Sequence, residues 1–370
     1  MEMVNEVRDN IMSGRSAVLR GDITRIAHRM KRAMQGAPLS LGFIGGSITH
    51  GSTASSFDKC YVNLVADWWR RKYPLSAVSV INAGIPGTGS LIGVHRVDRD
   101  VLIHKPDFVC VEFAVNDSGA ELAETYDSMV RKILLSEKLP GVMLIHMTND
   151  EGGGAEAMHS LTGAQYDLPM VSFRSAVWPE IESGRLKWAD FEVDTVHPND
   201  YGYSLVAKFI TDRLDEIHEF ALMNDVPQPP DHIAEPLNGD WFKDAKMMHS
   251  DVLKPVSYGG WETDPDTPMF GPGWKAVGLG DPMIFNVECR NVGIIYNWTS
   301  NGTMGRISVD IDGCEPLIIN AHARASAVAR GVMLFKHMPS EIHRLSIKLC
   351  EESSPGSTGR DFQICAVLTS

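Results

Sequence analysis

The sequence lacks the features of an exported or membrane-spanning protein. No apolar run approaches the roughly 18 residues that a transmembrane helix needs. The N-terminal segment from Met1 to Asp9 does not have the basic-then-apolar order of a signal peptide. The six cysteines include no Cys-x-x-Cys pair, so we predict that they are reduced and structural. These absences predict a cytoplasmic protein without a membrane partner.

The sequence also lacks an excess of positive charge. It holds 34 Lys and Arg against 47 Asp and Glu, which gives a formal net charge of −13. A surface of this sign offers no general attraction for nucleic acids or anionic membranes. Metal-binding signatures are missing as well, because neither a His-Glu-x-x-His motif nor a Cys/His set at zinc spacing occurs. The sequence therefore favours neither a nucleic-acid partner nor a metal cofactor.

The patterns that are present predict more than one domain, as the length of 370 residues also suggests. Between residues 38 and 225, short apolar runs alternate with helical patterns, which is typical of βαβ units around a parallel sheet. We predict a flavodoxin-like three-layer α/β/α domain in this range. The expected strands are 39–44, 77–81, 108–114, 142–146 and a short one near Phe191, and the expected helices are 58–72, 89–103, 121–137, 173–183 and 201–222.

The remaining segments have other patterns. Residues 1–37 are predicted to form a helical extension, because apolar residues recur there at helical spacing. Residues 226–240 are predicted to be a linker, since four prolines lie between Val226 and Pro236. Residues 241–370 hold short β-type segments separated by Gly, Pro, Asn and Asp, which predict an all-β sandwich of jelly-roll type. The strands expected there are 284–287, 292–296, 305–311, 317–319, 332–335, 343–349 and 362–368.

Ser47 follows a predicted buried strand through the glycines Gly45 and Gly46. Open α/β sheets bind ligands at the carboxyl edge of their strands, and glycines allow a tight turn that a substrate can approach. A serine at such a turn can be a nucleophile whose own N–H faces the developing oxyanion. A helix cap or a simple glycine turn would have the same sequence, so Ser47 alone is a weak signal.

Asp194 and His197 strengthen this signal, because they lie three residues apart in one loop before the long final helix. A carboxylate at this spacing can hold the imidazole in the tautomer that a general base needs. An isolated Asp-x-x-His more often belongs to a surface loop. With a serine at a strand end earlier on the same sheet, the two segments together predict a nucleophile, a base and an orienting acid.

Two further strand ends offer hydrogen-bond donors for an oxyanion. Asn116 follows an apolar strand, and its side chain supplies two N–H groups without charge, although an Asx turn that closes the strand is an alternative. Gly87 lies in a glycine-rich loop after the preceding strand, where its N–H could be another donor. Gly84 and Gly89 are alternatives in the same loop. A cofactor loop is disfavoured there, because the Gly-Lys-Ser/Thr of phosphate-binding loops is missing.

The order Ser, Gly, Asn, Asp-x-x-His resembles the SGNH (GDSL-like) hydrolase superfamily over about residues 38–222. The matching blocks are Gly45-Gly46-Ser47, Gly87, Val115-Asn116-Asp117 and Asp194-Thr-Val-His197-Pro198. The resemblance implies that Ser47 is the nucleophile, His197 the general base and Asp194 its orienting partner. It also implies an oxyanion hole formed by the N–H groups of Ser47 and Gly87 and the side chain of Asn116. No cofactor is implied.

The sequence departs from this family in reading Gly-Gly-Ser-Ile, where Gly-Asp-Ser-Leu is usual, and in having Ala114 where a glycine is common. The addition of a β-sandwich resembles carbohydrate esterases of the acetylxylan esterase type. This resemblance implies a serine esterase that removes O-acetyl groups from xylo-oligosaccharides or similar carbohydrates through an acyl-enzyme. The alternatives are a lipase or thioesterase for longer acyl chains and a non-catalytic carbohydrate-binding protein. The second domain could also provide the interface of a homo-oligomer.

Overall fold

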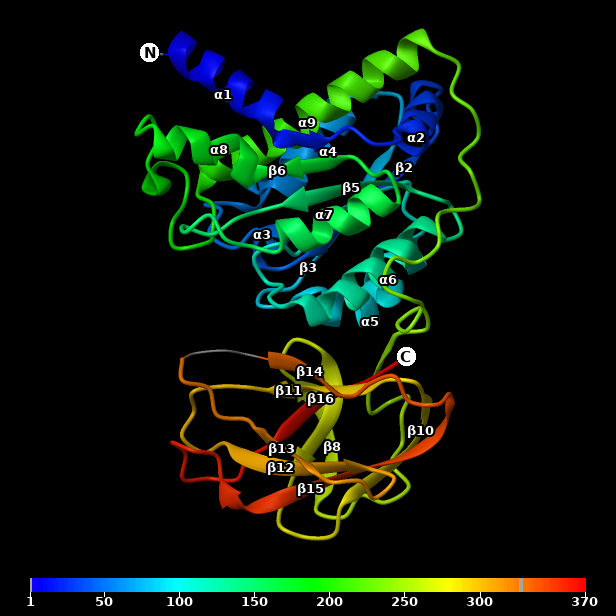
Figure 1. Ribbon diagram of the computed structural model, residues 1–370, viewed down its shortest axis with the longest axis vertical. Coiled ribbons are helices and arrows are strands. Elements are labelled where there is room, and N and C mark those ends of the chain that lie inside the picture. The colour runs from blue at the N-terminus through cyan, green and yellow to red at the C-terminus, as the bar shows by residue number, and fades with distance from the viewer. Residues whose placement is uncertain (1, 326–328) are drawn as a thin grey trace. The chain divides into compact units, whose positions relative to one another are not determined.

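The computed structural model describes residues 2–325 and 329–370 and consists of two compact units (Figure 1). The first unit ends at Asp240, and the second begins at Trp241. The first unit holds the mixed α/β part of the chain, and the second unit is built from strands.

The first unit is built on a six-stranded sheet of the order β1-β6-β5-β4-β2-β3. Strands β2 to β6 are parallel and follow the flavodoxin order, whereas β1 is an antiparallel edge strand next to β6. The central strands β4 and β5 are buried at every position, which explains their continuous apolar sequences. The strands are β1 Ala17–Leu19, β2 Leu39–Gly45, β3 Val78–Gly84, β4 Phe108–Glu112, β5 Gly141–His146 and β6 Met170–Ser172.

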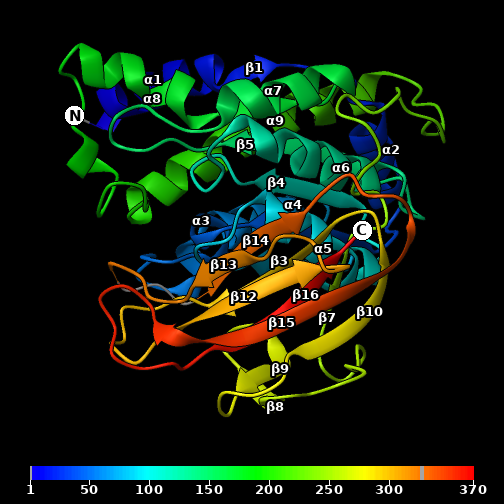
Figure 2. The same ribbon diagram turned by 60° about the horizontal axis from the view of Figure 1, so that its bottom comes forward.

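Helices cover both faces of this sheet, which confirms the predicted three-layer α/β/α architecture (Figures 1 and 2). One face carries α2 (Thr24–Met34), α4 (Tyr61–Lys72), α8 (Phe173–Glu182) and α9 (Asp200–Met223), whose apolar residues share one core with the sheet. The other face carries α5 (Ser90–Asp100), α6 (Ala123–Leu134) and α7 (Glu156–Gln165).

The prediction of a strand near Phe191 is wrong, because the fifth parallel strand is β6. Phe191 instead follows a short 3-10 helix, Trp188–Asp190, and its ring packs against Phe173 at a centroid distance of 5.6 Å. The residue is fully buried. Its apolar character therefore serves the contact between a loop and helix α8, and not a sheet.

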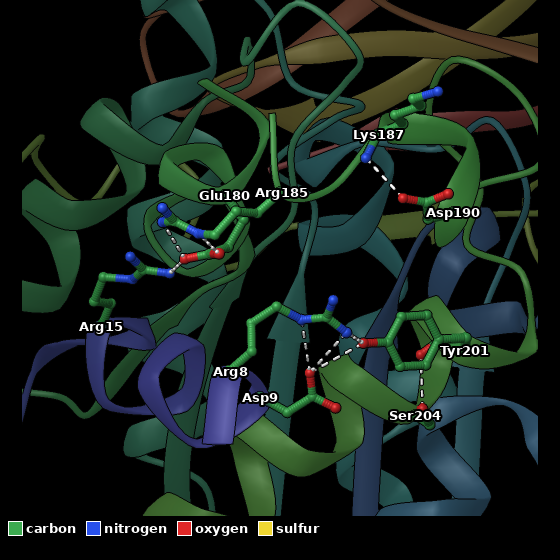
Figure 3. A network of polar contacts seen from close by, with 9 residues as sticks. All are labelled: Arg8, Asp9, Arg15, Glu180, Arg185, Lys187, Asp190, Tyr201 and Ser204. Carbon is green, nitrogen blue, oxygen red and sulfur yellow. Dashed lines mark hydrogen bonds and ion pairs between the residues drawn. The ribbon is translucent and has the colours of Figure 1, made fainter. Parts of the chain in front are cut away.

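The predicted N-terminal extension contains helix α1 (Glu2–Ser16) and docks on α8 through a buried carboxylate (Figure 3). Arg15 donates a hydrogen bond to Glu180 at 2.6 Å, and Arg185 donates to the other oxygen of the same carboxylate at 2.6 Å. The hydrogen bonds from Arg185 and Arg15 lower the pKa of Glu180 to about 2, although burial opposes them.

The same helix also contacts the beginning of α9 (Figure 3). The Tyr201 hydroxyl accepts a hydrogen bond from Arg8 at 2.9 Å and donates one to Asp9 at 3.0 Å. Helix α1 is thus attached to the helices that precede and follow the loop of residues 191–199.

The proline-rich segment 226–240 packs along the first unit. Arg25 donates to the carbonyl of Pro230 at 2.9 Å, and Gln165 donates to that of Glu235 at 2.8 Å. Further along, the N–H of Asn238 donates to Asp127 at 2.9 Å. These contacts come from helices on both faces of the sheet.

The second unit consists of two antiparallel sheets over one apolar core, which confirms the predicted all-β domain. One sheet has the order β10-β15-β12-β13, and the other has the order β14-β11-β16-β9-β8 with β7 paired to β16. Its jelly-roll connectivity stays a prediction. The strands are β7 Lys246–Met248, β8 Trp261–Thr267, β9 Gly271–Ala276, β10 Met283–Cys289, β11 Val292–Asn297, β12 Gly305–Ile311, β13 Leu317–Asn320, β14 Ala329–Phe335, β15 Glu341–Ser353 and β16 Gln363–Thr369.

Strand β8 was not predicted, because it does not alternate between buried and exposed residues. Trp261, Asp264 and Thr267 are buried with two exposed residues between each pair. A register shift in the pairing with β9 lies between Asp264 and Thr267, in the second of these two intervals.

The six cysteines are all free thiols. Within residues 2–325 and 329–370, none of the helices is long and apolar enough to cross a membrane.

Candidate active site

Ser47 lies at the carboxyl edge of β2, where two glycines make the turn. It is 7% exposed and begins the short helix α3 (Ser47–His50). A Cβ atom at Gly45 would lie 2.1 Å from Thr49 Oγ1, and one at Gly46 would lie 2.2 Å from Asn116 Oδ1. Any larger residue would displace these neighbours, so close packing around the serine requires both glycines.

His197 joins Ser47 and Asp194 in one hydrogen-bonded series. The Ser47 hydroxyl lies 2.8 Å from His197 Nε2, and Asp194 Oδ2 lies 2.8 Å from His197 Nδ1. A proton on Nδ1 is donated to the carboxylate, which leaves Nε2 free to accept the serine proton. The structure therefore brings the three predicted catalytic residues together in the order that a nucleophile, a base and an orienting acid need.

Asp194 is fixed by its own loop. Its Oδ1 atom accepts the backbone N–H groups of Val196 at 2.9 Å and His197 at 2.8 Å. Partial burial raises the pKa of Asp194, but these hydrogen bonds and the one from the His197 side chain outweigh it, so the pKa lies below its usual value. The carboxylate is therefore ionised at neutral pH and can stabilise a charged imidazole.

The two predicted oxyanion donors lie beside the same turn. The Asn116 amide contacts Gly46, and the carbonyl of Thr88 would lie 3.3 Å from a Cβ at that glycine. Gly87, next to Thr88, has a φ of +72°, which favours glycine, and the space beside its Cα is open. The side chain of Asn116 and the Gly87 loop thus approach the residue before Ser47 from two different strands.

The structure distinguishes Gly87 from the other two candidate glycines. The N–H of Gly84 is already donated to Asn82 Oδ1 at 2.9 Å. Gly89 faces Asp117, because a Cβ there would lie 2.3 Å from Asp117 Oδ1. Gly87 combines an open position with a backbone conformation that favours glycine, and its role as a donor stays a prediction.

Arg96 connects the two strands that carry these loops, although no sequence pattern singled it out. Its side chain on α5 is fully buried and donates to Gly45 O at 3.0 Å and to Ala83 O at 2.7 Å. A third hydrogen bond reaches Asp100 at 3.1 Å. An arginine in an amphipathic helix is normally exposed. Here its guanidinium holds the ends of β2 and β3 together, and with them the Ser47 and Gly87 loops.

Asp117 makes a second buried connection between these loops. One oxygen accepts the N–H of Ser90, the first residue of α5, at 2.8 Å, and the other lies 2.9 Å from His159 Nε2. Both side chains are fully buried. Burial lowers the pKa of His159, and the contact with Asp117 offsets this only in part. Asp117 follows Asn116 and Ser90 ends the Gly87 loop, so this carboxylate links the two predicted oxyanion donors. His159 was not predicted from the sequence, because helix α7 was not predicted either.

Two other buried carboxyl groups lie close to the site. Glu112 at the end of β4 accepts a hydrogen bond from Thr49 Oγ1 at 3.5 Å, and burial raises its pKa to about 8. Glu192 is 4% exposed, and neither of its oxygens has a hydrogen-bond partner within the described ranges 2–325 and 329–370. Burial and the nearby charge of Asp194 raise the pKa of Glu192 to about 9. Both groups are therefore mostly protonated at neutral pH.

The loop of residues 191–199 is held by hydrogen bonds from outside the sheet. Trp188 Nε1 donates to the carbonyl of Asp194 at 2.6 Å. The N–H of Asp150, in the loop after β5, donates to the carbonyl of Thr195 at 3.0 Å. In the part of the chain that the structure describes, no group of His, Cys, Asp or Glu side chains is arranged to hold a metal ion.

Comparison with known proteins agrees with this geometry. Residues 43–205 match the model of the GDSL-like Lipase/Acylhydrolase family. The solved structure of a two-domain esterase (CEX) active on acetylated mannans is 30% identical, with a TM-score of 0.89 over 97% of this chain and 98% of that one. The chain belongs to the GDSL-like lipase/acylhydrolase family. Within this family it is a two-domain SGNH hydrolase similar to a carbohydrate acetylesterase.

Other relatives in the family show where the similarity lies. The same esterase co-crystallised with mannopentaose has a TM-score of 0.88 at 30% identity, over 97% of both chains. The thioesterase 1/protease 1/lysophospholipase L1 of Escherichia coli strain K12 is 26% identical over 188 residues, which are 48% of this chain and 84% of that protein. The similarity to the mannan esterase thus includes the second unit, whereas the similarity to the E. coli enzyme covers about half of this chain.

Proposed function

We propose that the protein is a serine esterase that removes O-acetyl groups from oligosaccharides. The observation that carries this proposal is the series of two 2.8 Å contacts from Ser47 through His197 to Asp194. The similarity over both units to an esterase active on acetylated mannans supports the acyl group and the class of substrate.

The first step acylates Ser47. The Ser47 oxygen attacks the acetyl carbonyl carbon, and its proton passes to His197 Nε2, while Asp194 stabilises the charged imidazole. The resulting oxyanion accepts hydrogen bonds from the N–H groups of Ser47 and Gly87 and from the Asn116 side chain. As the tetrahedral intermediate collapses, the bond to the sugar oxygen breaks and His197 protonates that oxygen. The sugar leaves with a free hydroxyl, and the acetyl group remains on Ser47.

The second step releases acetate. His197, again neutral, removes a proton from a water molecule that attacks the acetyl-serine carbonyl. The same donors stabilise the second oxyanion, and its collapse returns the proton from His197 to the Ser47 oxygen. Over the two steps, one ester and one water molecule give one alcohol and one molecule of acetic acid.

We propose acetylated mannan-type and xylan-type oligosaccharides as the first substrates to compare. We choose mannan-type oligosaccharides because the esterase that is similar over both units is active on acetylated mannans. We choose xylan-type oligosaccharides because the sequence motifs resemble those of acetylxylan esterases. A chain with a net charge of −13 does not attract polyanions, and this charge is compatible with a neutral acetylated sugar as substrate.

Acetate release from these oligosaccharides tests the proposal. We expect Ser47→Ala to lower kcat roughly 10⁴-fold or more with unchanged thermal unfolding, as for other serine hydrolases that lose the nucleophile. Ser52→Ala is the matched control, because this nearby hydroxyl contacts His50 and not His197. Retention of wild-type acetate release by Ser47→Ala would overturn the assignment.

A thioesterase or lipase acting on longer acyl chains is the second candidate, and the similarity to the E. coli thioesterase 1 favours it. Rates on p-nitrophenyl esters of increasing length separate the two. An acetylesterase loses activity steeply beyond two or three carbons, whereas a lipase gains it. Failure of a fluorophosphonate probe to label Ser47 would instead indicate a non-catalytic carbohydrate-binding protein.

A further inference from the structure

A pocket of about 770 Å³ opens at the edge of the first sheet that lies opposite the catalytic edge. Its walls are helix α2, the turn that precedes β5 and the first residues of the proline-rich segment. Ser47 and Asn116 follow the carboxyl ends of their strands, whereas this pocket lies at the amino ends. A six-residue strand such as β5 separates two such edges by roughly 20 Å, so the pocket is distinct from the catalytic site.

The pocket concentrates positive charge in a chain whose net charge is −13. Four cationic side chains line it, Arg29, Lys31, Arg32 and Lys138, against one lining carboxylate, Asp225. Like charges placed together repel each other, which costs free energy unless something neutralises them.

Two of these cations form no ion pair with the residues that the structure describes. Arg29 and Lys138 share one carboxylate, Asp107, at 3.6 and 3.1 Å. The side chains of Lys31 and Arg32 take part in none of the ion pairs formed within residues 2–325 and 329–370. Subtracting the carboxylates of Asp107 and Asp225 from the four cations leaves two positive charges.

The walls of the pocket are fixed by hydrogen bonds to backbone carbonyls. The Arg29 guanidinium donates to the carbonyls of Lys138 and Leu139. Arg25, one turn earlier on α2, donates to the carbonyl of Leu134 at 2.6 Å and to that of Pro230 at 2.9 Å. The proline-rich wall is therefore held against the helix before any ligand arrives.

His28 is a titratable residue in the wall of the same pocket. Burial and the charges of Arg29 and Arg32 lower the pKa of His28, which lines the same pocket. His28 is therefore neutral at pH 7 and does not add to the count of cations.

We propose that this pocket binds a phosphate-type oxyanion with two negative charges, free or carried by a small phosphorylated molecule. Two uncompensated cations match a dianion, and a guanidinium donates paired hydrogen bonds to phosphate oxygens. The volume exceeds what a bare ion needs and falls in the range of small-molecule sites. The site is independent of the esterase reaction.

Calorimetric titration with inorganic phosphate tests the proposal, with chloride at equal ionic strength as the reference. Phosphate is expected to bind and to raise the unfolding temperature, because a ligand that binds only the folded state stabilises it. A second titration uses glucose 6-phosphate, with glucose as the control. Tighter binding of glucose 6-phosphate than of inorganic phosphate would identify a phosphorylated small molecule as the ligand.

Charge reversal at one residue supplies the specific variant. Arg32→Glu is expected to weaken phosphate binding at least tenfold, the loss typical of removing a charge-assisted hydrogen bond and adding a repulsive charge. Arg71→Glu makes the same change of charge at an exposed position outside the pocket, and it should change binding less than twofold. Lys31→Gln is a milder variant that removes one cation, and circular dichroism checks the fold of each.

Two results would overturn the proposal. One is an unfolding temperature that phosphate raises no more than chloride does. The other is an equal loss of binding in Arg71→Glu and Arg32→Glu, which would show a general electrostatic attraction and not a site. Acetate release by the variants stays at the wild-type level, so a negative result here leaves the proposed esterase function untouched.

Discussion

The two halves of the candidate active site are held in different ways. The Ser47 half follows β2 and is nearly inaccessible, with buried connections through Arg96 and Asp117. The His197 half lies in a loop outside the sheet, and the side chain of Asp194 is 48% exposed. Hydrogen bonds to its backbone carbonyls, from the Trp188 indole and from the N–H of Asp150, hold this second half in place.

This difference matches the roles that the two halves would have in the proposed reaction. The oxyanion donors must stay fixed while charge develops, because preorganised dipoles stabilise a transition state without reorganising. The base must accept a proton, release it and admit water, so a position close to solvent suits it. Changes to the side chains that anchor the buried half, Arg96 and Asp117, should therefore affect stability and kcat together. Changes on the loop half should affect kcat with little loss of stability.

The largest expected effect separates the base from its orienting acid. We expect His197→Ala to lower kcat roughly 10⁵-fold or more and Asp194→Ala roughly 10³- to 10⁴-fold. The smaller effect follows because water can reach His197 Nδ1 where the exposed carboxylate is removed. Acetate release at a fixed pH measures both values. Equal losses in the two variants would contradict the expectation that water partly replaces the exposed Asp194 carboxylate.

The next largest effect concerns Arg96. Arg96→Met leaves the carbonyl of Ala83 without this donor and should lower the free energy of unfolding by about 3–5 kcal/mol. We also expect kcat to fall at least tenfold, because the Ser47 and Gly87 loops lose a common anchor. Denaturant unfolding and kcat are measured together.

A matched control is available for that variant. Arg213 on α9 is also buried and donates to a backbone carbonyl, that of Arg20, and to Glu216, but it lies outside the candidate site. Arg213→Met should lose stability and keep kcat. If both variants keep kcat, Arg96 has no positioning role.

A pH-dependent effect is expected from Glu192. Its pKa is raised to about 9 in the folded protein, so between pH 4.5 and 9 the unfolded chain has released a proton that the folded chain retains. The free energy of unfolding therefore falls as pH rises through this window, by up to about 1.4 kcal/mol per pH unit. Glu192→Gln should raise the unfolding temperature at pH 8 and leave it unchanged at pH 4. An exposed control, Glu219→Gln, should change neither, and an equal shift at both pH values would contradict the prediction.

The smallest expected effect belongs to Trp188. Trp188→Phe keeps the aromatic contact with Phe191 but removes the hydrogen bond to the carbonyl of Asp194. The loss of one neutral hydrogen bond, about 1 kcal/mol, should lower kcat/KM roughly fivefold with little change in the unfolding temperature. A wild-type value would show that the remaining hydrogen bonds suffice to place the loop.

Most of the sheet was predictable from the sequence because its central strands are buried on both faces. Four of the five parallel strands were placed within a few residues, since a short, continuous apolar run between helical patterns is typical of a strand covered on both sides. The fifth was wrong because β6 has only three residues, and because Phe191 is buried although it lies in a loop. A short strand and a buried loop give the same local signal, and only pairing with β5 separates them.

The sequence by itself determined which residues were available for chemistry and at which edge they would lie. Ser47, Gly87 and Asn116 follow three neighbouring parallel strands, whose carboxyl ends necessarily share one edge of the sheet. The Asp-x-x-His spacing likewise predicted the contact between Asp194 and His197, because two residues three positions apart in one loop can form a hydrogen bond.

Only the tertiary structure decided which polar groups are buried and what they contact. Arg96 contacts residues of other elements, and so do Asp117 and His159. The carboxylate of Glu192 has no hydrogen-bond partner within the described residues. No local sequence pattern reveals such contacts or their absence. The same holds for the cations of α2, which acquire a pocket only when the turn before β5 and the proline-rich segment fold against them. Burial and charge pairing depend on contacts between distant parts of the chain, and those contacts exist only in the folded protein.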